Sequence, residues 1–373
     1  MAGIYIHIPF CRQACHYCDF HFSTQLGAME EMVNAICTEL ELKKAYLGSS
    51  KIETIYFGGG TPSILQASFL DKILSKIHQQ FPLNLREVTL EANPDDLQTE
   101  NLNHWKALGI DRLSLGIQSF QEEILKFYNR AHSAQEAKQA ISKAREAGFS
   151  KFSIDMIYGF PAADHTLWQA DLEEALSQDP GHISAYALTV EPKTALGNWT
   201  KKGKFLPADE DFVADQFEYL QSELEKNNYI QYEVSNFGKE GQFALHNSNY
   251  WKGISYLGIG PSAHSFDGKT RGVNPSSNPR YLKQISQGII PTESETLSLT
   301  DALNERILTG LRTIWGVSLE ELRMNFGIDL LDSKKSEIAD FKKQGWLKSD
   351  DKTLSLTKSG LLLADSIAAK LFL

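Results

Sequence analysis

Three cysteines lie close together near the N-terminus, in the segment IHIPFCRQACHYCDFHF, residues 6–22. Cys11 and Cys15 are separated by three residues, and Cys15 and Cys18 by two. Thiolates at such short spacings are typical ligands of zinc or of an iron–sulfur cluster. A zinc site would need a fourth ligand, which His16 or His21 could supply, but no second Cys-x-x-Cys follows in the chain. A 4Fe–4S cluster held by three cysteines would instead leave one iron open to a further ligand.

The composition limits the classes of protein that could carry such a centre. The 373 residues are 42% hydrophobic and 23% charged, which is typical of a globular chain with a sizeable core. The net charge of −10 argues against a general nucleic-acid binder. No apolar run approaches the ~18 residues of a membrane span, and the N-terminus MAGIYIHIPF lacks the charged segment of a signal peptide. We therefore expect a cytoplasmic protein, in which clustered thiols form metal or redox sites.

The elements that must position these cysteines alternate between short apolar strands and amphipathic helices. This alternation predicts repeated βαβ units around a parallel sheet, and hence an α/β fold. Six strands, and no Gly-x-Gly-x-x-Gly after the first, favour a partial TIM-like (β/α)6 barrel over a doubly wound sheet. The fourth cysteine, Cys37, lies in a helical segment and is expected to pack in the core. The predicted strands are 3–9, 52–57, 87–92, 112–118, 152–158 and 183–190.

Polar and glycine-rich residues recur where these strands end. The cysteine loop follows the first strand, and GGGTP (58–62) follows the second. Glu91 closes the third strand, Gln118 closes the fourth, and Asp155 lies within the fifth. Because the carboxyl ends of barrel strands meet at one face, we expect one site to collect these residues.

The remainder of the chain divides into two further segments, so that we predict domains 1–196, 197–300 and 301–373. Residues 197–300 are irregular, contain HNSNYW (246–251), and are expected to extend the barrel and cover one edge. Residues 301–373 predict three helices, a hairpin and a last helix, as in a winged-helix module. This segment has 11 Lys and Arg against 11 Asp and Glu, so a docking or structural role is favoured over DNA binding.

The cysteine motif, with Tyr17 before the last cysteine, resembles the radical S-adenosylmethionine superfamily. The resemblance implies that Cys11, Cys15 and Cys18 hold a 4Fe–4S cluster whose open iron is chelated by S-adenosylmethionine. An electron from the cluster would then cleave the sulfonium to a 5′-deoxyadenosyl radical. GGGTP resembles the glycine motif of that superfamily, which implies contacts from Gly59, Gly60 and Thr61, with no Cβ to block the approach of the cofactor.

A closer resemblance, over most of the chain, is to oxygen-independent coproporphyrinogen III oxidase and its relatives. It implies further cofactor contacts from residues in YIHIPFC, LEANP, GIQSF, NRAH and SIDMIYG. Carboxylates among them suit ammonium and hydroxyl groups, and an arginine suits a carboxylate. By their numbers in this chain, these residues are Tyr5, Glu91, Gln118, Arg130 and Asp155.

The chain departs from that oxidase at Phe20, where the oxidase motif continues to a further cysteine. This departure and HNSNYW resemble the HemW subgroup of haem chaperones. The subgroup implies that the chain binds haem and delivers it to respiratory membrane proteins, with peripheral membrane contact only through such a partner. His246 is the expected axial ligand, His264 is the alternative, and Tyr250 and Trp251 offer flat apolar surface.

The alternative function is oxidative decarboxylation of coproporphyrinogen III in porphyrin biosynthesis. A third class, an interaction protein with a structural cluster, depends on the C-terminal segment alone. Whether the chain turns over as an enzyme, and its oligomeric state, stay open at this point.

Overall fold

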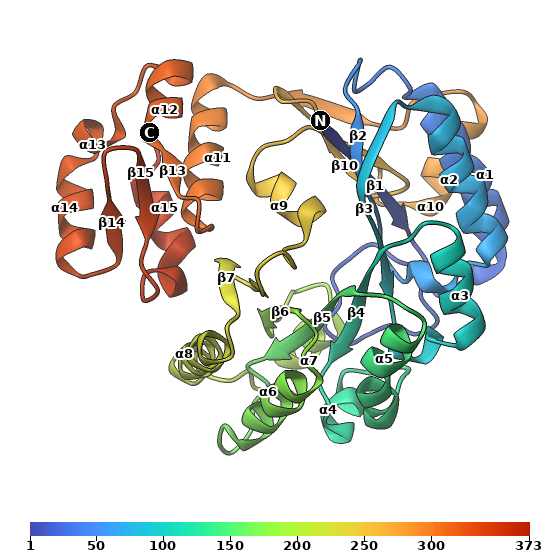
Figure 1. Ribbon diagram of the computed structural model, residues 1–373, viewed down its shortest axis with the longest axis horizontal. Coiled ribbons are helices and arrows are strands. Elements are labelled where there is room, and N and C mark those ends of the chain that lie inside the picture. The colour runs from blue at the N-terminus through green and yellow to red at the C-terminus, as the bar shows by residue number, and fades with distance from the viewer.

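The computed structural model describes residues 1–373, and its centre is an open sheet of 12 strands (Figure 1). Six neighbouring strands, β1 to β6, are parallel and follow one another in chain order. The strands at the two ends of the sheet do not pair with each other, so the barrel is partial, as predicted. The six strands are β1 (Ala2–Ile8), β2 (Ile52–Gly59), β3 (Leu83–Ala92), β4 (Arg112–Gln118), β5 (Lys151–Tyr158) and β6 (His182–Ala187).

Helices on the outer side of the curved sheet connect the parallel strands (Figure 1). In the second of them, Leu70, Ile73, Leu74 and Ile77 are buried, and this spacing places them on one helical face. They belong to a core of 55 buried residues that come from the strands of the sheet and from the helices packed on it. The helices are α1 (Met29–Leu42), α2 (Ala67–Gln80), α3 (Thr99–Ala107), α4 (Glu122–Phe127), α5 (Ala134–Glu146) and α6 (Thr166–Gln178).

The irregular middle of the chain extends the sheet at both edges, whereas the sequence led us to expect one. β7 (Ile230–Glu233) and β8 (Asn236–Gly238) form an antiparallel pair beside β6. At the other edge β9 (Tyr256–Ile259) is parallel to β1, and β10 (His264–Phe266), β11 (Thr270–Val273) and β12 (Glu293–Thr296) continue it antiparallel. The helices of this region are α7 (Ala195–Lys201), α8 (Glu210–Lys226), α9 (Leu245–Trp251) and α10 (Asn278–Ser286).

The C-terminal part of the chain is helical and has its own core of 15 buried residues. A small antiparallel sheet, β13 (Val317–Ser318), β15 (Thr353–Leu356) and β14 (Leu347–Ser349), completes it. The predicted hairpin is β14–β15; the two-residue β13 and the one-turn α13 were not expected. The helices are α11 (Leu299–Leu311), α12 (Leu319–Phe326), α13 (Leu330–Ser333), α14 (Lys335–Lys343) and α15 (Ala364–Leu371).

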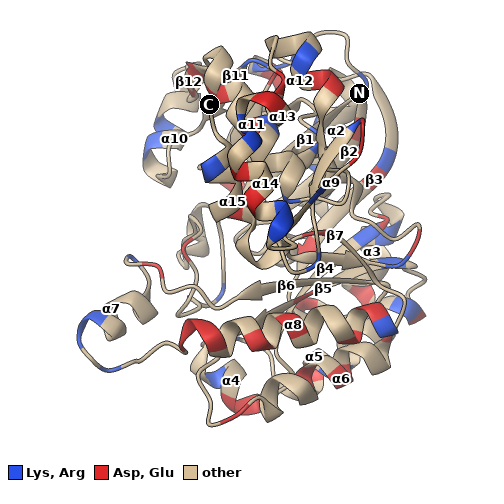
Figure 2. Cartoon of the chain, turned by 90° about the vertical axis from the view of Figure 1, so that its left-hand side faces the viewer, with Lys and Arg blue, Asp and Glu red and all other residues tan.

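An ion pair joins the two parts of the molecule. Arg312, which follows α11, contacts Glu233 of β7 at 3.2 Å, and the Glu233 side chain is 2% exposed. Figure 2 shows acidic and basic residues interspersed along the C-terminal helices, and this segment has equal numbers of both. None of the helices combines the length and the apolar composition that a membrane span requires.

Candidate cluster and cofactor site

A cavity of about 460 Å³ lies at the carboxyl ends of the parallel strands. It is lined by the cysteine loop, the glycine motif and the polar strand ends. The sequence predicted each of these three groups at this face from a separate motif. Tyr5 and His246 are absent from its lining. The predicted residues that line it are Cys11, Cys15, Tyr17, Cys18, Gly59, Gly60, Thr61, Glu91, Gln118, Arg130 and Asp155.

The three cysteines fit a cluster better than a single metal ion. All three are free and partly exposed to the cavity, whereas Cys37 is buried in α1. Their side chains do not converge with any other His, Cys, Asp or Glu on one point, as tetrahedral zinc would require. A 4Fe–4S cluster takes each thiolate on a different iron, so convergence is not needed. Burial raises the pKa of the Cys18 thiol to about 12, so a nearby cation such as iron is needed to hold a thiolate there.

Two cavity residues donate directly to these sulfurs. Thr61 Oγ1 donates to Cys11 Sγ at 3.4 Å, and Arg130 Nη1 donates to Cys15 Sγ at 3.4 Å. Donors of this kind stabilise negative charge on sulfur and orient the ligand. Arg130 is itself fixed by Nη2, which donates to Asn93 Oδ1 at 2.6 Å and to the Gly116 carbonyl at 2.7 Å. Its buried Nε has no partner in the protein, so this arginine keeps a donor for a bound group.

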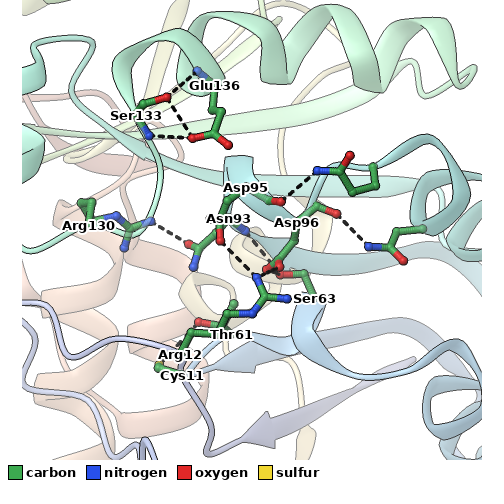
Figure 3. Close-up of polar contacts among 12 residues, drawn as sticks. Cys11, Arg12, Thr61, Ser63, Asn93, Asp95, Asp96, Arg130, Ser133 and Glu136 are labelled. Carbon is green, nitrogen blue, oxygen red and sulfur yellow. Dashed lines mark hydrogen bonds and ion pairs between the residues drawn. The ribbon is translucent and has the colours of Figure 1, made fainter.

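The cysteine loop is clamped from the loop after β3 (Figure 3). Arg12, directly after Cys11, pairs with Asp95 at 3.1 Å and with the carboxylate of Asp96. Asp96 is 1% exposed and also accepts a hydrogen bond from Ser63 Oγ at 2.6 Å. The same loop supplies Asn93 to Arg130. One short loop therefore positions both the cluster ligands and the arginine beside them.

Two half-buried carboxylates, Glu91 and Asp155, face the cavity from β3 and β5. Burial raises the pKa of Glu91 to about 7 and that of Asp155 to about 6. Glu91 accepts from the Tyr56 hydroxyl at 2.8 Å and from the Gly59 N–H at 3.2 Å. Ser114 Oγ donates to Asp155 at 3.3 Å. Both carboxylates are poised to ionise against a cationic ligand such as an ammonium group.

The glycine motif is needed for close packing of the backbone. A Cβ on Gly60 would lie 2.5 Å from the Phe10 carbonyl, and Gly59 has φ +108°, which other residues rarely adopt. The Gly60 N–H donates to the Ile8 carbonyl, and the Thr61 N–H to that of Phe10, both at 2.8 Å. The glycines thus bring the loop after β2 against the cysteine loop, a packing role that adds to the predicted approach of a cofactor.

Gln118 occupies a strained position at the end of β4. Its φ of +67° lies in the left-handed region, which costs energy for a side chain other than glycine. Buried Asp171 on α6 holds the next residues, since it accepts from Ser119 Oγ at 2.5 Å and from the Phe120 N–H at 2.7 Å. Strain maintained in this way is typical of functional positions. Asp171, like Asp96, was missed from the sequence because no motif marks it.

Comparison with known proteins places the chain in a family. A model of the radical SAM superfamily matches residues 5–170, and one of the HemN C-terminal domain matches residues 297–363. The heme chaperone HemW of Bacillus subtilis is 34% identical over 98% of both chains. The heme chaperone HemW of Lactococcus lactis is 33% identical over 99% of this chain and 97% of its own. The chain belongs to the HemW family.

Radical SAM membership implies a 4Fe–4S cluster and S-adenosylmethionine, for which the residues of the 460 Å³ cavity are suited. The fold agrees with that of coproporphyrinogen III oxidase HemN from Escherichia coli. That structure has a TM-score of 0.86, covers 100% of this chain and 90% of its own, and is 21% identical. At that identity the similarity concerns the fold.

Two predicted residues lie elsewhere in this HemW-family chain. Tyr5 stacks on Tyr56, with ring centroids 5.9 Å apart, and lines a second, larger cavity. His246 is 2% exposed, and both of its ring nitrogens have partners inside the protein. Nδ1 is 2.8 Å from Thr54 Oγ1, and Nε2 is 2.8 Å from the Tyr250 hydroxyl. Ligation of haem iron by His246 would break one of these buried contacts, so this geometry argues against our prediction of that role.

Proposed function

We propose that this chain is a haem chaperone that also binds a 4Fe–4S cluster and S-adenosylmethionine. The observation that carries the proposal is the end-to-end similarity to bacterial proteins named heme chaperones. Cys11, Cys15 and Cys18 would hold the cluster, and haem would be passed in the cytoplasm to respiratory proteins at the membrane. We expect no nucleic-acid partner, because the chain has a net charge of −10.

The cavity residues have separate tasks in this proposal. When bound, the cluster supplies an electron that can cleave S-adenosylmethionine. Glu91 and Asp155 offer carboxylates to the cationic and hydroxyl groups of the cofactor, and Arg130 can pair with its carboxylate. Arg12 holds the cysteine loop against the loop after β3 through its ion pair with Asp95.

Phe20 separates this function from the alternative, decarboxylation of coproporphyrinogen III. The oxidase motif that the chain resembles has a cysteine at this position, whereas Phe20 is 73% exposed and lies at the border of the two cavities. A decarboxylase must hold a propionate beside a reactive centre in a narrow orientation. An exposed aromatic ring instead offers a flat apolar contact.

One preparation tests both functions. The full chain, with its cluster reconstituted anaerobically, is incubated with coproporphyrinogen III, S-adenosylmethionine and a low-potential reductant, and the products are separated. The same preparation is titrated with haem. We expect saturable haem binding and no porphyrinogen conversion. Conversion that requires the cluster, shown by its loss in Cys15→Ser, would favour the oxidase function instead.

A further inference from the structure

A second cavity, of about 740 Å³, lies between the sheet edge and the C-terminal helices. Its walls come from β1, from β9 to β11, from the end of α9, and from α11 and α12. Ala302, Glu305, Arg306 and Thr309 face it from α11, and their spacing places them on one side of that helix. The volume lies within the roughly 300–1,000 Å³ of pockets that enclose organic ligands. None of the cofactor residues described above except Tyr5 contributes to it.

Aromatic side chains dominate the apolar part of this wall. Ring systems of this kind stack on flat apolar ligands. Phe20 is shared with the smaller cavity, so the two cavities meet at the loop that follows Cys18. A ligand here would lie beside the cluster loop without displacing S-adenosylmethionine. The aromatic residues are Tyr5, Phe20, Tyr250, Trp251, Tyr256, Phe266 and Phe326.

His264 is the histidine of this wall that has both ring nitrogens free to bind a metal ion. It is exposed on β10, and no hydrogen bond joins either ring nitrogen to the protein. His7 is 4% exposed, and its two nitrogens contact the His21 carbonyl at 2.9 Å and the Tyr5 hydroxyl at 3.3 Å. His21 has Nε2 within 2.8 Å of Asn278 Oδ1, so only its Nδ1 stays free. Partial desolvation and the nearby Arg271 guanidinium lower the pKa of His264, a shift that favours the neutral imidazole over the protonated one.

The charged side chains of the cavity leave one cation without a carboxylate partner. Arg271 pairs with Glu305, and Arg306 pairs with Glu321, both at 2.8 Å. Lys252 makes no ion pair, and its ammonium lies 4.2 Å from the centroid of the Trp315 ring. An acidic group on a ligand would meet Lys252 at the rim at little cost, because no existing ion pair has to break.

We propose that haem occupies this inter-domain cavity, with His264 as an axial ligand of the iron, the aromatic wall against the porphyrin, and Lys252 toward a propionate. The proposal rests on the haem-chaperone function and specifies where that function is carried out. These residues match three features of haem. The aromatic wall suits its flat apolar ring, His264 suits its iron, which binds imidazole, and Lys252 suits its acidic substituents.

The test is a titration of ferric haem into the full chain with its cluster reconstituted, followed by the Soret band. His264→Ala should shift the Soret maximum and raise the dissociation constant by at least about tenfold. His246→Ala should leave the position of the Soret maximum as in the wild type. Ala302→Trp, which fills the cavity from α11 and leaves His264 in place, should also weaken binding. Its matched control is Ala107→Trp, at an exposed helical position outside both cavities, which should bind as the wild type does.

The outcomes separate this site from the function on which it rests. Saturable wild-type binding with an unchanged spectrum and affinity in His264→Ala overturns the site and leaves the chaperone function standing. Equal affinity of Ala302→Trp and Ala107→Trp overturns the cavity assignment. Absence of saturable haem binding by the wild type removes the chaperone function and the site together.

Discussion

Replacing Arg12 by alanine should loosen the cluster without touching a ligand. The Arg12 side chain is 50% exposed, so its ion pairs contribute only about 0.2–1 kcal/mol. The larger cost falls on Asp96, whose side chain is 0% exposed and would keep a single hydrogen bond, from Ser63. A buried polar group that loses a partner costs about 1–3 kcal/mol. We therefore expect the cysteine loop to be destabilised by about 2 kcal/mol in Arg12→Ala.

The assay is the rate at which a chelator removes iron from the reconstituted chain, because iron leaves through local opening of the cysteine loop. A cost of about 2 kcal/mol corresponds to a rate about 30-fold faster than that of the wild type. Arg86→Ala, which breaks an exposed pair with Glu53 far from the cluster, should leave the rate unchanged. In an Asp96→Asn background, Arg12→Ala should change the rate by less than about threefold, since only the pair with Asp95 remains. Equal rates in Arg12→Ala and the wild type, or the full effect in that background, would refute the clamp.

Four further substitutions test other parts of the structure. Cys37→Ser should keep a full complement of cluster iron, whereas Cys15→Ser should lose the cluster; iron analysis and visible absorption distinguish them. The raised pKa of Glu91, about 7, means that the folded chain holds a proton that the unfolded chain releases near pH 4.5. The free energy of unfolding of the cofactor-free chain should therefore fall between pH 5 and 7, and it should fall less steeply in Glu91→Gln. Denaturant titrations at several pH values measure this free energy. An equal pH dependence in the two proteins would contradict the prediction. The affinity for S-adenosylmethionine should rise over the same interval, as Glu91 ionises. Arg312→Ala should lower the free energy of unfolding by about 1–3 kcal/mol, because it leaves the buried carboxylate of Glu233 without its cation. An unchanged denaturation midpoint would contradict a stabilising role of this ion pair.

The strands of the partial barrel could be predicted because their signal is local. β4 was expected at 112–118 and lies at Arg112–Gln118, and β3 ends at Ala92 as expected. Strands buried on both faces appear as short apolar runs, and each carboxyl end shows its polar residue directly in the sequence. That is why most of the predicted cofactor residues line one cavity.

The parts that could not be predicted depend on contacts between distant segments. Thr54, which occupies one nitrogen of His246, is 192 residues away in the chain, and Asp96 is 84 residues from Arg12. The sequence does not show whether the ring nitrogens of a histidine are free or hydrogen-bonded. Only the fold shows that both nitrogens of His246 have partners and that those of His264 have none. The small C-terminal sheet shows the same limit, because the two residues of β13 carry no periodic signal.

A transfer experiment shows directly whether this chain carries haem to other proteins. The full chain is loaded with haem, freed of excess ligand, and mixed with a haem-free respiratory membrane protein in vesicles. The absorption of each protein is read after they are separated. We expect haem to leave the chain and to appear in the acceptor, and we expect His264→Ala to deliver less haem because it loads less. Haem that stays with the loaded wild-type chain, or that reaches the acceptor equally well from solution without it, would contradict a haem-delivery function.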